Sequence, residues 1–426
     1  MAISCGHGTV KLVESRPPVV AIVEPHGEGH HPMYVAGFWQ AFQAIGCSTL
    51  FVGPQQVAAD AESAYPRGEC VIPSDARIHW DPFGSGVVSG LSARDGAGTL
   101  WKELVDVLAQ QPVDLVFLLS LDSFVTEMPP AVGWPEIPWR FSGLWFRPPS
   151  ASAKTLREAS RRVIRYGRRF RLLRTPRCGP VLVLDDQSAI GHLGGYTGQG
   201  VFAAPEFSTY DRPNHMSNAA VPILKRVGDR RIVALLGSLE PRKGVREFIR
   251  AAASSDPSEW AFVLAGRLYR DVFDAETLEM LKRCAEGDNP RILMHDGWLE
   301  AAELNELVAS ADLLFLCYDN WMFSTNMLCK SSFFRVPVLS YDKGYAGRMV
   351  RRHNLGLLAE DRSDVVRLFC STGFGGSLER LRRSDRFVRG CCEYQAMNSI
   401  SALAGVLYHV FRGTSCALSL AAKDQS

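Results

Sequence analysis

The sequence predicts an α/β protein made of two Rossmann-like domains whose parallel sheets face each other across a cleft. The first observation is length, because 426 residues exceed what a single hydrophobic core usually serves. The second is a repeated unit of a short β-branched run, a glycine-containing turn and an amphipathic helix, which is typical of βαβ structure. The third is that the runs are continuously apolar, as strands are when helices cover both faces of a parallel sheet.

The first region with this pattern starts at a strand expected over residues 19–23. A polar glycine loop follows, and an apolar helix is then expected over residues 35–45. Further strands are expected over residues 48–52, 115–119 and 181–184.

The second region repeats the pattern. Strands are expected over residues 231–236, 260–264, 291–294, 313–316 and 336–340, and helices over residues 245–253, 275–284 and 302–309. Between the regions, Pro213, Asn214 and Pro222 indicate a linker. We therefore divide the chain into a first domain over residues 1–215, a second domain over residues 216–390, and a C-terminal segment over residues 391–426 that is helical as far as Tyr408.

Composition narrows the class of protein. A hydrophobic content of 46% and a charged content of 22% are ordinary for a soluble globular protein, and a net charge of +2 argues against nucleic-acid binding. The 11 cysteines include no CxxC pair, which favours reduced thiols in a cytoplasmic protein over a disulfide framework. No secretory signal and no run of about 20 apolar residues is visible, so any membrane contact is expected to be peripheral.

The most specific motif is the octapeptide GSLEPRKG at residues 237–244, between an expected strand and an expected helix. Glycine lets the backbone approach a ligand closely, and the start of a helix offers N–H groups to an anion. Arg242 and Lys243 add two cations. The motif predicts a phosphate site at the carboxyl end of a strand, with an ordinary basic turn as the alternative.

The motif and its flanks, VALLGSLEPRKGVREFIRAA, resemble the start of the nucleotide-binding domain of family-4 glycosyltransferases, which have the GT-B fold. The resemblance implies that Lys243 contacts the diphosphate of a nucleotide-sugar donor. Ser238 stands where the family usually has arginine, and Arg242 is expected to supply the missing charge. In GT-B proteins a C-terminal helix often crosses back to the first domain, which the resemblance implies for residues 391–426.

The segment ILMHDGWLEAAELNELVASADLLFLC resembles the family's strand, glycine turn, helix and next strand. The resemblance implies that the backbone near Gly297 and Trp298 lines the pocket for the nucleotide base. The alternative for Trp298 is ordinary packing beside the domain interface.

One departure concerns the two acids that the family carries in an E-x7-E motif. Counting back from VPV in the segment VPVLSYDKG, which resembles the end of this motif's region, places Met322 and Lys330 at the two positions, so both acids are absent. Ser324, Thr325 and Asn326 precede the helix that carries Lys330, and these groups together form a candidate anion cradle. The alternative is a capped helix with a solvent-facing lysine.

In the first domain, VEPHGEGHHPMYVAGFWQAFQAIG resembles the family's opening turn, which implies that Gly27 and Gly29 face the cleft on the acceptor side. Histidine suits proton transfer near neutral pH, so His30 is the candidate catalytic residue. Adjacent histidines in a loop are otherwise surface or capping residues. Metal binding by His26, His30 and His31 is disfavoured, because the spacing lacks an HExxH pattern.

Asp122 and Arg147 follow apolar runs and are further candidates on the acceptor side, with turn formation as the alternative. The basic stretch from Arg157 to Arg174 fits peripheral contact with an anionic membrane or binding of an acidic acceptor. A solvated helix face is the alternative.

The implied function is glycosyl transfer of a hexosyltransferase-like kind from a nucleotide sugar to a saccharide, lipid-linked or small-molecule acceptor. The resemblance implies retention of anomeric configuration. Lys243, Arg242, Ser324 and Lys330 are expected to stabilise the leaving diphosphate without a metal, and no cofactor is expected. The absent acids favour one alternative, a GT-B protein that binds a nucleotide without turnover, and a nucleotide-sugar epimerase is a further alternative.

Overall fold

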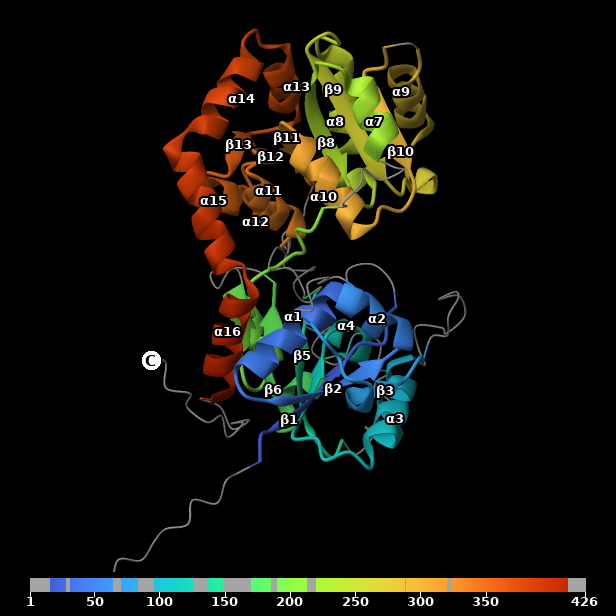
Figure 1. The fold of residues 1–426 in the computed structure, drawn as a ribbon, viewed down its shortest axis with the longest axis vertical. Helices are drawn as coiled ribbons and strands as arrows, with labels where there is room; N and C mark the ends of the chain where they lie inside the picture. Colours follow the sequence, from blue (N-terminus) through green and yellow to red (C-terminus); the bar gives the residue numbers. More distant parts are fainter. Residues whose placement is uncertain are drawn as a thin grey trace, which may run out of the picture.

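The structure is a computed structural model with two parallel β-sheets, each surrounded by helices, and Figure 1 shows the second domain above the first. It describes residues 16–27, 31–63, 70–82, 96–125, 137–146, 148, 170–184, 190–212, 220–287, 289–319 and 324–412. The two sheets form two Rossmann-like domains, which confirms the α/β class expected from the sequence.

The first domain contains a seven-stranded sheet in the order β3-β2-β1-β4-β5-β6-β7. Its strands are β1 (Val19–Val23), β2 (Ser48–Gly53), β3 (Arg77–His79), β4 (Leu115–Leu118), β5 (Arg140–Leu144), β6 (Cys178–Val183) and β7 (Val201–Ala203). Neighbouring strands pair in parallel, and β4 and β6 are buried along their whole length. Burial on both faces explains why these segments are continuously apolar.

The helices of the first domain are α1 (His31–Ala44), α2 (Gln55–Ser63), α3 (Gly96–Leu108) and α4 (Leu121–Val125), with short 3₁₀ helices η1 (Ser74–Ala76), η2 (Arg171–Arg174) and η3 (Gly191–Tyr196). Helix α1 starts at His31, four residues before the expected start at Val35. Pro32 lies in its first turn, where the fixed φ of proline favours a helix start.

The second domain contains a six-stranded parallel sheet in the order β10-β9-β8-β11-β12-β13. Its strands are β8 (Arg231–Leu236), β9 (Trp260–Gly266), β10 (Ile292–Asp296), β11 (Leu313–Phe315), β12 (Val338–Tyr341) and β13 (Gly356–Ala359). Its helices are α7 (Ala220–Val227), α8 (Val245–Ser254), α9 (Ala275–Ala285), α10 (Ala301–Ser310), α11 (Asn326–Phe334), α12 (Gly344–His353), α13 (Arg362–Cys370), α14 (Phe374–Arg383) and α15 (Asp385–Met397), with 3₁₀ helices η4 (Pro241–Lys243) and η5 (Arg270–Val272).

The chain then returns to the first domain through α16 (Ile400–Arg412), which Figure 1 shows beside α1. Phe387 and Tyr394 of α15 still belong to the core of the second domain. Leu407 and Phe411 of α16 are fully buried in the core of the first domain. The segment after residue 390 therefore serves both domains, and the return itself is made by α16.

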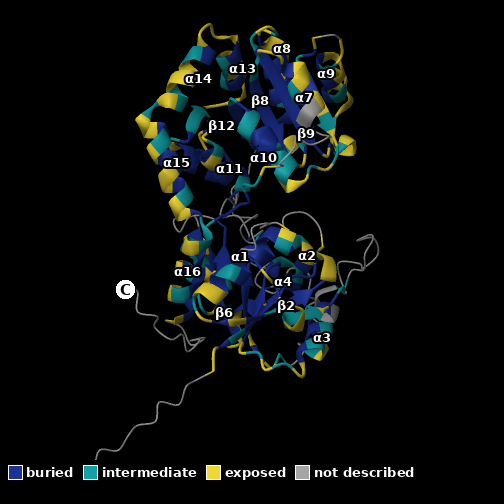
Figure 2. Ribbon diagram, viewed as in Figure 1, coloured by how far each residue is buried: buried dark blue, intermediate teal, exposed yellow. Residues whose placement is uncertain are grey.

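Each sheet separates two hydrophobic cores, one on each face. In Figure 2 the strands are buried in the middle of each domain and the exposed residues lie on the outer helices. Apolar side chains thus cover both faces of each sheet, so polar functional groups are expected at the ends of the strands.

Candidate functional site

Each sheet has a point at which the order of its strands reverses, between β1 and β4 in the first domain and between β8 and β11 in the second. In open α/β sheets, ligands bind beyond the carboxyl ends of the strands at such a point. The segments that follow these four strands carry Glu24, Ser120, Gly237 and Tyr318. The fold therefore directs attention to two clusters, one in each domain.

The turn after β8 depends on its glycines. Gly237 has a φ of +89° and Gly244 has a φ of +75°, conformations that disfavour a side chain. A Cβ atom on Gly244 would lie 2.5 Å from the carbonyl oxygen of Cys317, which follows β11. The glycines thus hold the turn against the end of the neighbouring strand, and the 3₁₀ helix η4 between them presents Arg242 and Lys243.

Lys243 is a cation held at the end of the sheet. Its Nζ atom donates to the carbonyl oxygen of Leu236 at 3.3 Å and lies 5.7 Å from the ring centroid of Tyr318. Loss of hydration, and then the nearby charge of Arg242, lower the pKa of Lys243 to about 8, although Glu240 opposes this. An anion bound beside this ammonium would stabilise its charged form and raise its pKa.

Arg242 is partly neutralised within the turn. Its Nε and Nη2 atoms donate to the two carboxylate oxygens of Glu240, at 2.7 and 3.2 Å. Its carbonyl oxygen accepts from the backbone N–H of Asp319 at 2.6 Å, which joins the turn to the segment after β11. Ser238, between these residues and the strand, is exposed.

Gly297 and Trp298 follow β10 at the same edge of the sheet. The N–H of Gly297 donates to the carbonyl oxygen of Gly266 at 3.3 Å, which joins the ends of β9 and β10. The side chain of Trp298 is 60% exposed. Core packing therefore does not explain this tryptophan, whose ring is open to a ligand.

The start of α11 lies at the contact between the domains. Thr325 caps the helix, its hydroxyl accepting from the N–H of Met327 at 3.4 Å, and Asn326 is the first helical residue. The N–H of Ser324 donates to the carbonyl oxygen of Leu184, which follows β6, at 3.1 Å. This contact brings the carboxyl edges of the two sheets together at the N-terminus of α11.

Lys330 faces the linker. Its Nζ atom donates to the carbonyl oxygen of Thr209 at 2.8 Å and to Oδ1 of Asn305 at 2.6 Å, and the residue is 2% exposed. Burial lowers the pKa of Lys330 to about 8. These contacts correct both sequence interpretations, since the lysine neither faces solvent nor belongs to the anion cradle at the helix start. Met322, the other position of the lost acidic pair, lies outside the described residues.

In the first domain, Glu24 is the centre of a buried polar cluster. It directly follows β1 and is 0% exposed. Its carboxylate accepts from Nδ1 of His31 at 2.9 Å, from the N–H of His26 at 2.9 Å, and from the Ser120 hydroxyl at 2.8 and 3.0 Å. The Nε2 atom of His26 in turn lies 2.7 Å from the Ser123 hydroxyl.

Electrostatics keep Glu24 charged in spite of its burial. Loss of hydration acts to raise its pKa, but the charge and hydrogen bond of His31, followed by those of His26, lower it, and the net shift is downward. An ionised carboxylate can only accept hydrogen bonds, so Nδ1 of His31 carries the ring proton.

The other acceptor-side candidates lie around this cluster or outside the described chain. Gly27 is exposed just after the cluster. The carboxylate of Asp122 accepts from the N–H of Phe146 at 2.8 Å, so it fixes the turn after β5. Gly29, His30 and Arg147 lie outside the described residues, as does most of the basic stretch from residue 157 to residue 174.

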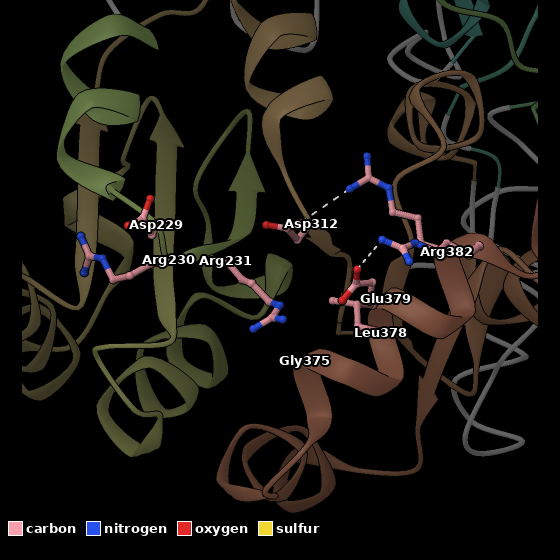
Figure 3. Close-up of a pocket in the computed structure, with 9 residues that line it drawn as sticks. Asp229, Arg230, Arg231, Asp312, Gly375, Leu378, Glu379 and Arg382 are labelled. Carbon is pink, nitrogen blue, oxygen red and sulfur yellow. Dashed lines mark hydrogen bonds and ion pairs between the residues drawn. The ribbon is translucent and has the colours of Figure 1, made fainter.

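A separate hollow of about 600 Å³ opens at the opposite edge of the second sheet (Figure 3). It lies where β8 begins and just before β11, and α14 forms its other wall. Several of its charged residues form ion pairs with each other, as Arg382 does with Asp312 and Arg383 does with Glu379. The amino ends of the strands are the wrong edge for a ligand of this fold.

Two searches of the described residues gave no candidates. No group of three or more histidine, cysteine, aspartate or glutamate side chains in this part of the chain is arranged to hold a metal ion. No helix within the same residues has the length and apolar character needed to cross a bilayer.

Comparison with known proteins identifies the fold. No family profile and no curated protein matches the sequence. Among solved structures, the chain is similar to Anabaena HepE in complex with UDP and glucose, with a TM-score of 0.61 and 13% identity, covering 93% of this chain and 100% of that one. It is also similar to sucrose-phosphate synthase from Thermosynechococcus elongatus, with a TM-score of 0.60 and 16% identity, covering 93% and 98% of the two chains.

A further similar structure is a putative UDP-N-acetylglucosamine 2-epimerase from Listeria monocytogenes, with a TM-score of 0.55 and 13% identity, covering 94% of this chain and 98% of that one. At these identities the likeness defines the architecture. The protein has the GT-B fold, with two Rossmann-like domains and a C-terminal helix that returns to the first.

Sequence reasoning missed Glu24, Ser120 and the pairing of His31. A usable signal was present, because Glu24 directly follows an apolar strand at a position where βαβ proteins place functional groups. Ser120 is 96 residues away in the sequence, so its contact with Glu24 was not visible there.

Proposed function

We propose that this protein transfers a sugar from a nucleotide-sugar donor to an acceptor, and that the second domain holds the donor. The observation that carries the proposal is Lys243, a half-buried cation on a glycine-bounded turn at the reversal point of the sheet. A diphosphate placed there would gain charge-assisted hydrogen bonds from the lysine and from the backbone of the turn.

The remaining donor contacts follow from the same edge of the sheet. Trp298 offers an exposed ring beside Gly297, where a nucleotide base can stack. Ser324, Thr325 and Asn326 lie at the N-terminus of α11, whose N–H groups would stabilise negative charge on a leaving diphosphate. Together with Lys243 and Arg242, these groups support departure of the diphosphate without a metal ion.

The similar structures guide the choice of donor. HepE was solved with UDP and glucose, so UDP-glucose is the first donor to test. The similarity to a UDP-N-acetylglucosamine 2-epimerase makes epimerisation the second candidate. Analysis of the products without an added acceptor separates the two, because an epimerase returns an isomeric nucleotide sugar, whereas a transferase either leaves the donor unchanged or transfers the sugar to water and gives free sugar and nucleoside diphosphate.

The first experiment measures binding of UDP and of a panel of nucleotide sugars by calorimetry for the wild type and for Lys243→Ala. We expect the substitution to weaken binding about 10- to 100-fold, as loss of one charge-assisted hydrogen bond does. Lys282→Ala, on the exposed face of α9, is the matched control and should bind like the wild type. Equal affinity of the wild type and Lys243→Ala would reject the assignment of the diphosphate site.

A further inference from the structure

Glu206 carries a buried carboxyl group at the place where the chain passes from the first domain to the second. It follows β7 and is 2% exposed. The next residue, Phe207, belongs to the core of the first domain, whereas the carbonyl oxygen of Thr209 is held by Lys330 of the second domain. The N–H of Glu206 donates at 3.0 Å to Oδ1 of Asn398, which lies between α15 and α16. The outward and the return connection between the domains therefore meet at this residue.

The carboxyl group itself contacts both domains. The Tyr34 hydroxyl of α1 donates to its Oε1 atom at 2.5 Å from the first domain, and Ser324 at the start of α11 approaches it from the second. Ser324 is also the residue whose N–H donates across the contact to the carbonyl oxygen of Leu184, at 3.1 Å. The protonation state of Glu206 is consequently set inside the contact that joins α11 to the first domain.

Within the part of the chain that the structure describes, no cation compensates a negative charge on Glu206. The polar groups that act on it are hydroxyls and a thiol, on Tyr34 (α1), Ser324, Cys329 (α11), Tyr345 (α12) and Tyr394 (α15). Burial raises the pKa of the three tyrosines and of the cysteine, so these groups stay protonated near neutral pH. Lys330, next to the cysteine, donates instead to Thr209 and Asn305. Its pKa of about 8 leaves most of its charge in place up to pH 7.5.

A buried carboxyl group without a cation is favoured in its neutral form, because only that form avoids the cost of removing a charge from water. Loss of hydration accordingly raises the pKa of Glu206 from 4.5 to about 7, although its hydrogen bonds oppose the shift. If the contact between the domains opened, water would reach the carboxylate and its pKa would return towards the ordinary value. The closed contact therefore binds a proton that the open contact releases.

We propose that Glu206 is a proton-dependent latch between the domains: the neutral group holds α11 against the first domain, and the ionised group favours opening of this contact. The latch goes beyond the proposed glycosyl transfer and does not depend on it. The proton stabilises the closed contact fully below pH 4.5, and this stabilisation is lost as the pH rises through 7. From pH 5.5 to pH 7.5 the ratio of open to closed contact should rise about 20-fold.

Hydrogen exchange on the full chain measures this opening at one atom. The N–H of Ser324 is hydrogen-bonded across the contact, so its protection factor, the intrinsic exchange rate divided by the observed rate at the same pH, reports the ratio of closed to open contact. In the wild type we expect this protection factor to fall about 20-fold from pH 5.5 to pH 7.5. The N–H of Leu328, which donates to Thr325 in the first turn of α11, should keep its protection, because the helix itself stays formed.

Glu206→Gln keeps the shape of the side chain and cannot ionise. Its Ser324 protection factor should differ by less than about twofold between the two pH values. The matched control is Glu259→Gln, which removes a carboxylate paired with Arg231 at the surface of the second domain and should show the wild-type fall. Tyr34→Phe is a second variant, and it removes a hydrogen bond that favours the ionised carboxylate. Its fall should be displaced to higher pH.

A wild-type protection factor that is equal at the two pH values would reject the latch, and this result needs no variant. A fall of the wild-type size in Glu206→Gln, or an undisplaced fall in Tyr34→Phe, would assign the proton to another group and reject it as well. A parallel loss of protection at Leu328 would mean that the helix, rather than the contact, opens. Since no sugar transfer is measured, failure of the latch leaves the proposed function standing, and the reverse also holds.

Discussion

Lys243 and Glu24 are ionisable groups of opposite charge, and a different effect dominates the pKa of each. Loss of hydration dominates at Lys243 and lowers its pKa to about 8. At Glu24 the neighbouring histidines outweigh loss of hydration, and the pKa falls below its usual value. Lys243 would therefore be stabilised by a bound anion, whereas Glu24 is already stabilised by the hydrogen bonds and charges of its neighbours.

The proposed diphosphate makes a proton-linked prediction at Lys243. A bound anion favours the ammonium, so its pKa should rise from about 8 on binding. At pH 8 the wild type should take up a fraction of a proton when it binds UDP, and affinity should fall as the pH rises further, because free Lys243 then loses its charge. Calorimetry in buffers of different ionisation enthalpy measures the uptake.

The matched measurement is the same titration on Lys243→Ala. This variant should show no uptake linked to a group that titrates near pH 8. Uptake of equal size in both proteins would place the titrating group elsewhere and contradict the role of Lys243.

Residue types in the donor turn could be predicted from sequence, but their partners could not. The octapeptide at residues 237–244 is contiguous, so its glycines and cations are visible together. Lys330 was expected at an anion site or in solvent, because its acceptors on Thr209 and Asn305 lie 121 and 25 residues away. Pairings over such separations are set by the fold.

Among the secondary-structure elements, most strands were expected from their apolar sequences, whereas β3, β5, β7 and β13 were not. β1, β4, β8 and β9 were expected close to their observed bounds. β5, with the sequence RFSGL, was missed because Ser142 and Gly143 are typical of turns. The structure shows why glycine is needed there, since a Cβ atom on Gly143 would collide with the carbonyl oxygen of Leu118 in the neighbouring strand.

Helix α16 should contribute strongly to the free energy of unfolding of the first domain. Phe411 is fully buried and lies 6.1 Å from Phe42 and 6.5 Å from Phe117 between ring centroids. Phe411→Ala should lower the free energy of unfolding of the first domain by about 3–5 kcal/mol. Denaturant unfolding followed by tryptophan fluorescence measures this change.

His409→Ala, one residue from a buried position but itself exposed, serves as the control for α16. It should change the free energy of unfolding by less than about 0.5 kcal/mol. An equally small effect of Phe411→Ala would mean that α16 does not belong to the core of the first domain in solution.

At the scale of the whole molecule, the two domains meet through a buried carboxyl group. Glu206 is 2% exposed and follows β7, its N–H donates to Oδ1 of Asn398 between α15 and α16, and its carboxyl group contacts Tyr34 and Ser324. Loss of hydration raises its pKa to about 7, although hydrogen bonds from Tyr34 and Ser324 oppose the shift. Both connections between the domains pass beside this residue.

Glu206 should make stability depend on pH. Because its pKa is raised from 4.5 to about 7, the folded protein binds a proton there that the unfolded chain has released. The stabilisation is complete below pH 4.5 and is lost as the pH rises through 7. Glu206→Gln should remove this dependence, on the order of 2–3 kcal/mol between pH 4.5 and 8.

Thermal and denaturant unfolding at several pH values tests this prediction. Glu259→Gln, a carboxylate paired with Arg231 at the surface of the second domain, is the control and should keep the wild-type pH dependence. A Glu206→Gln protein whose stability still falls between pH 4.5 and 7 by the wild-type amount would contradict it.

The position of α16 has a consequence for biosynthesis. The first domain is translated before the second, yet the surface of α1 that α16 covers stays open to water until α16 leaves the ribosome. Domains usually fold in the order in which they are made. Here the domain that emerges first is completed last, so a nascent chain released before residue 400 would carry an exposed aromatic surface that chaperones or a neighbouring chain could bind.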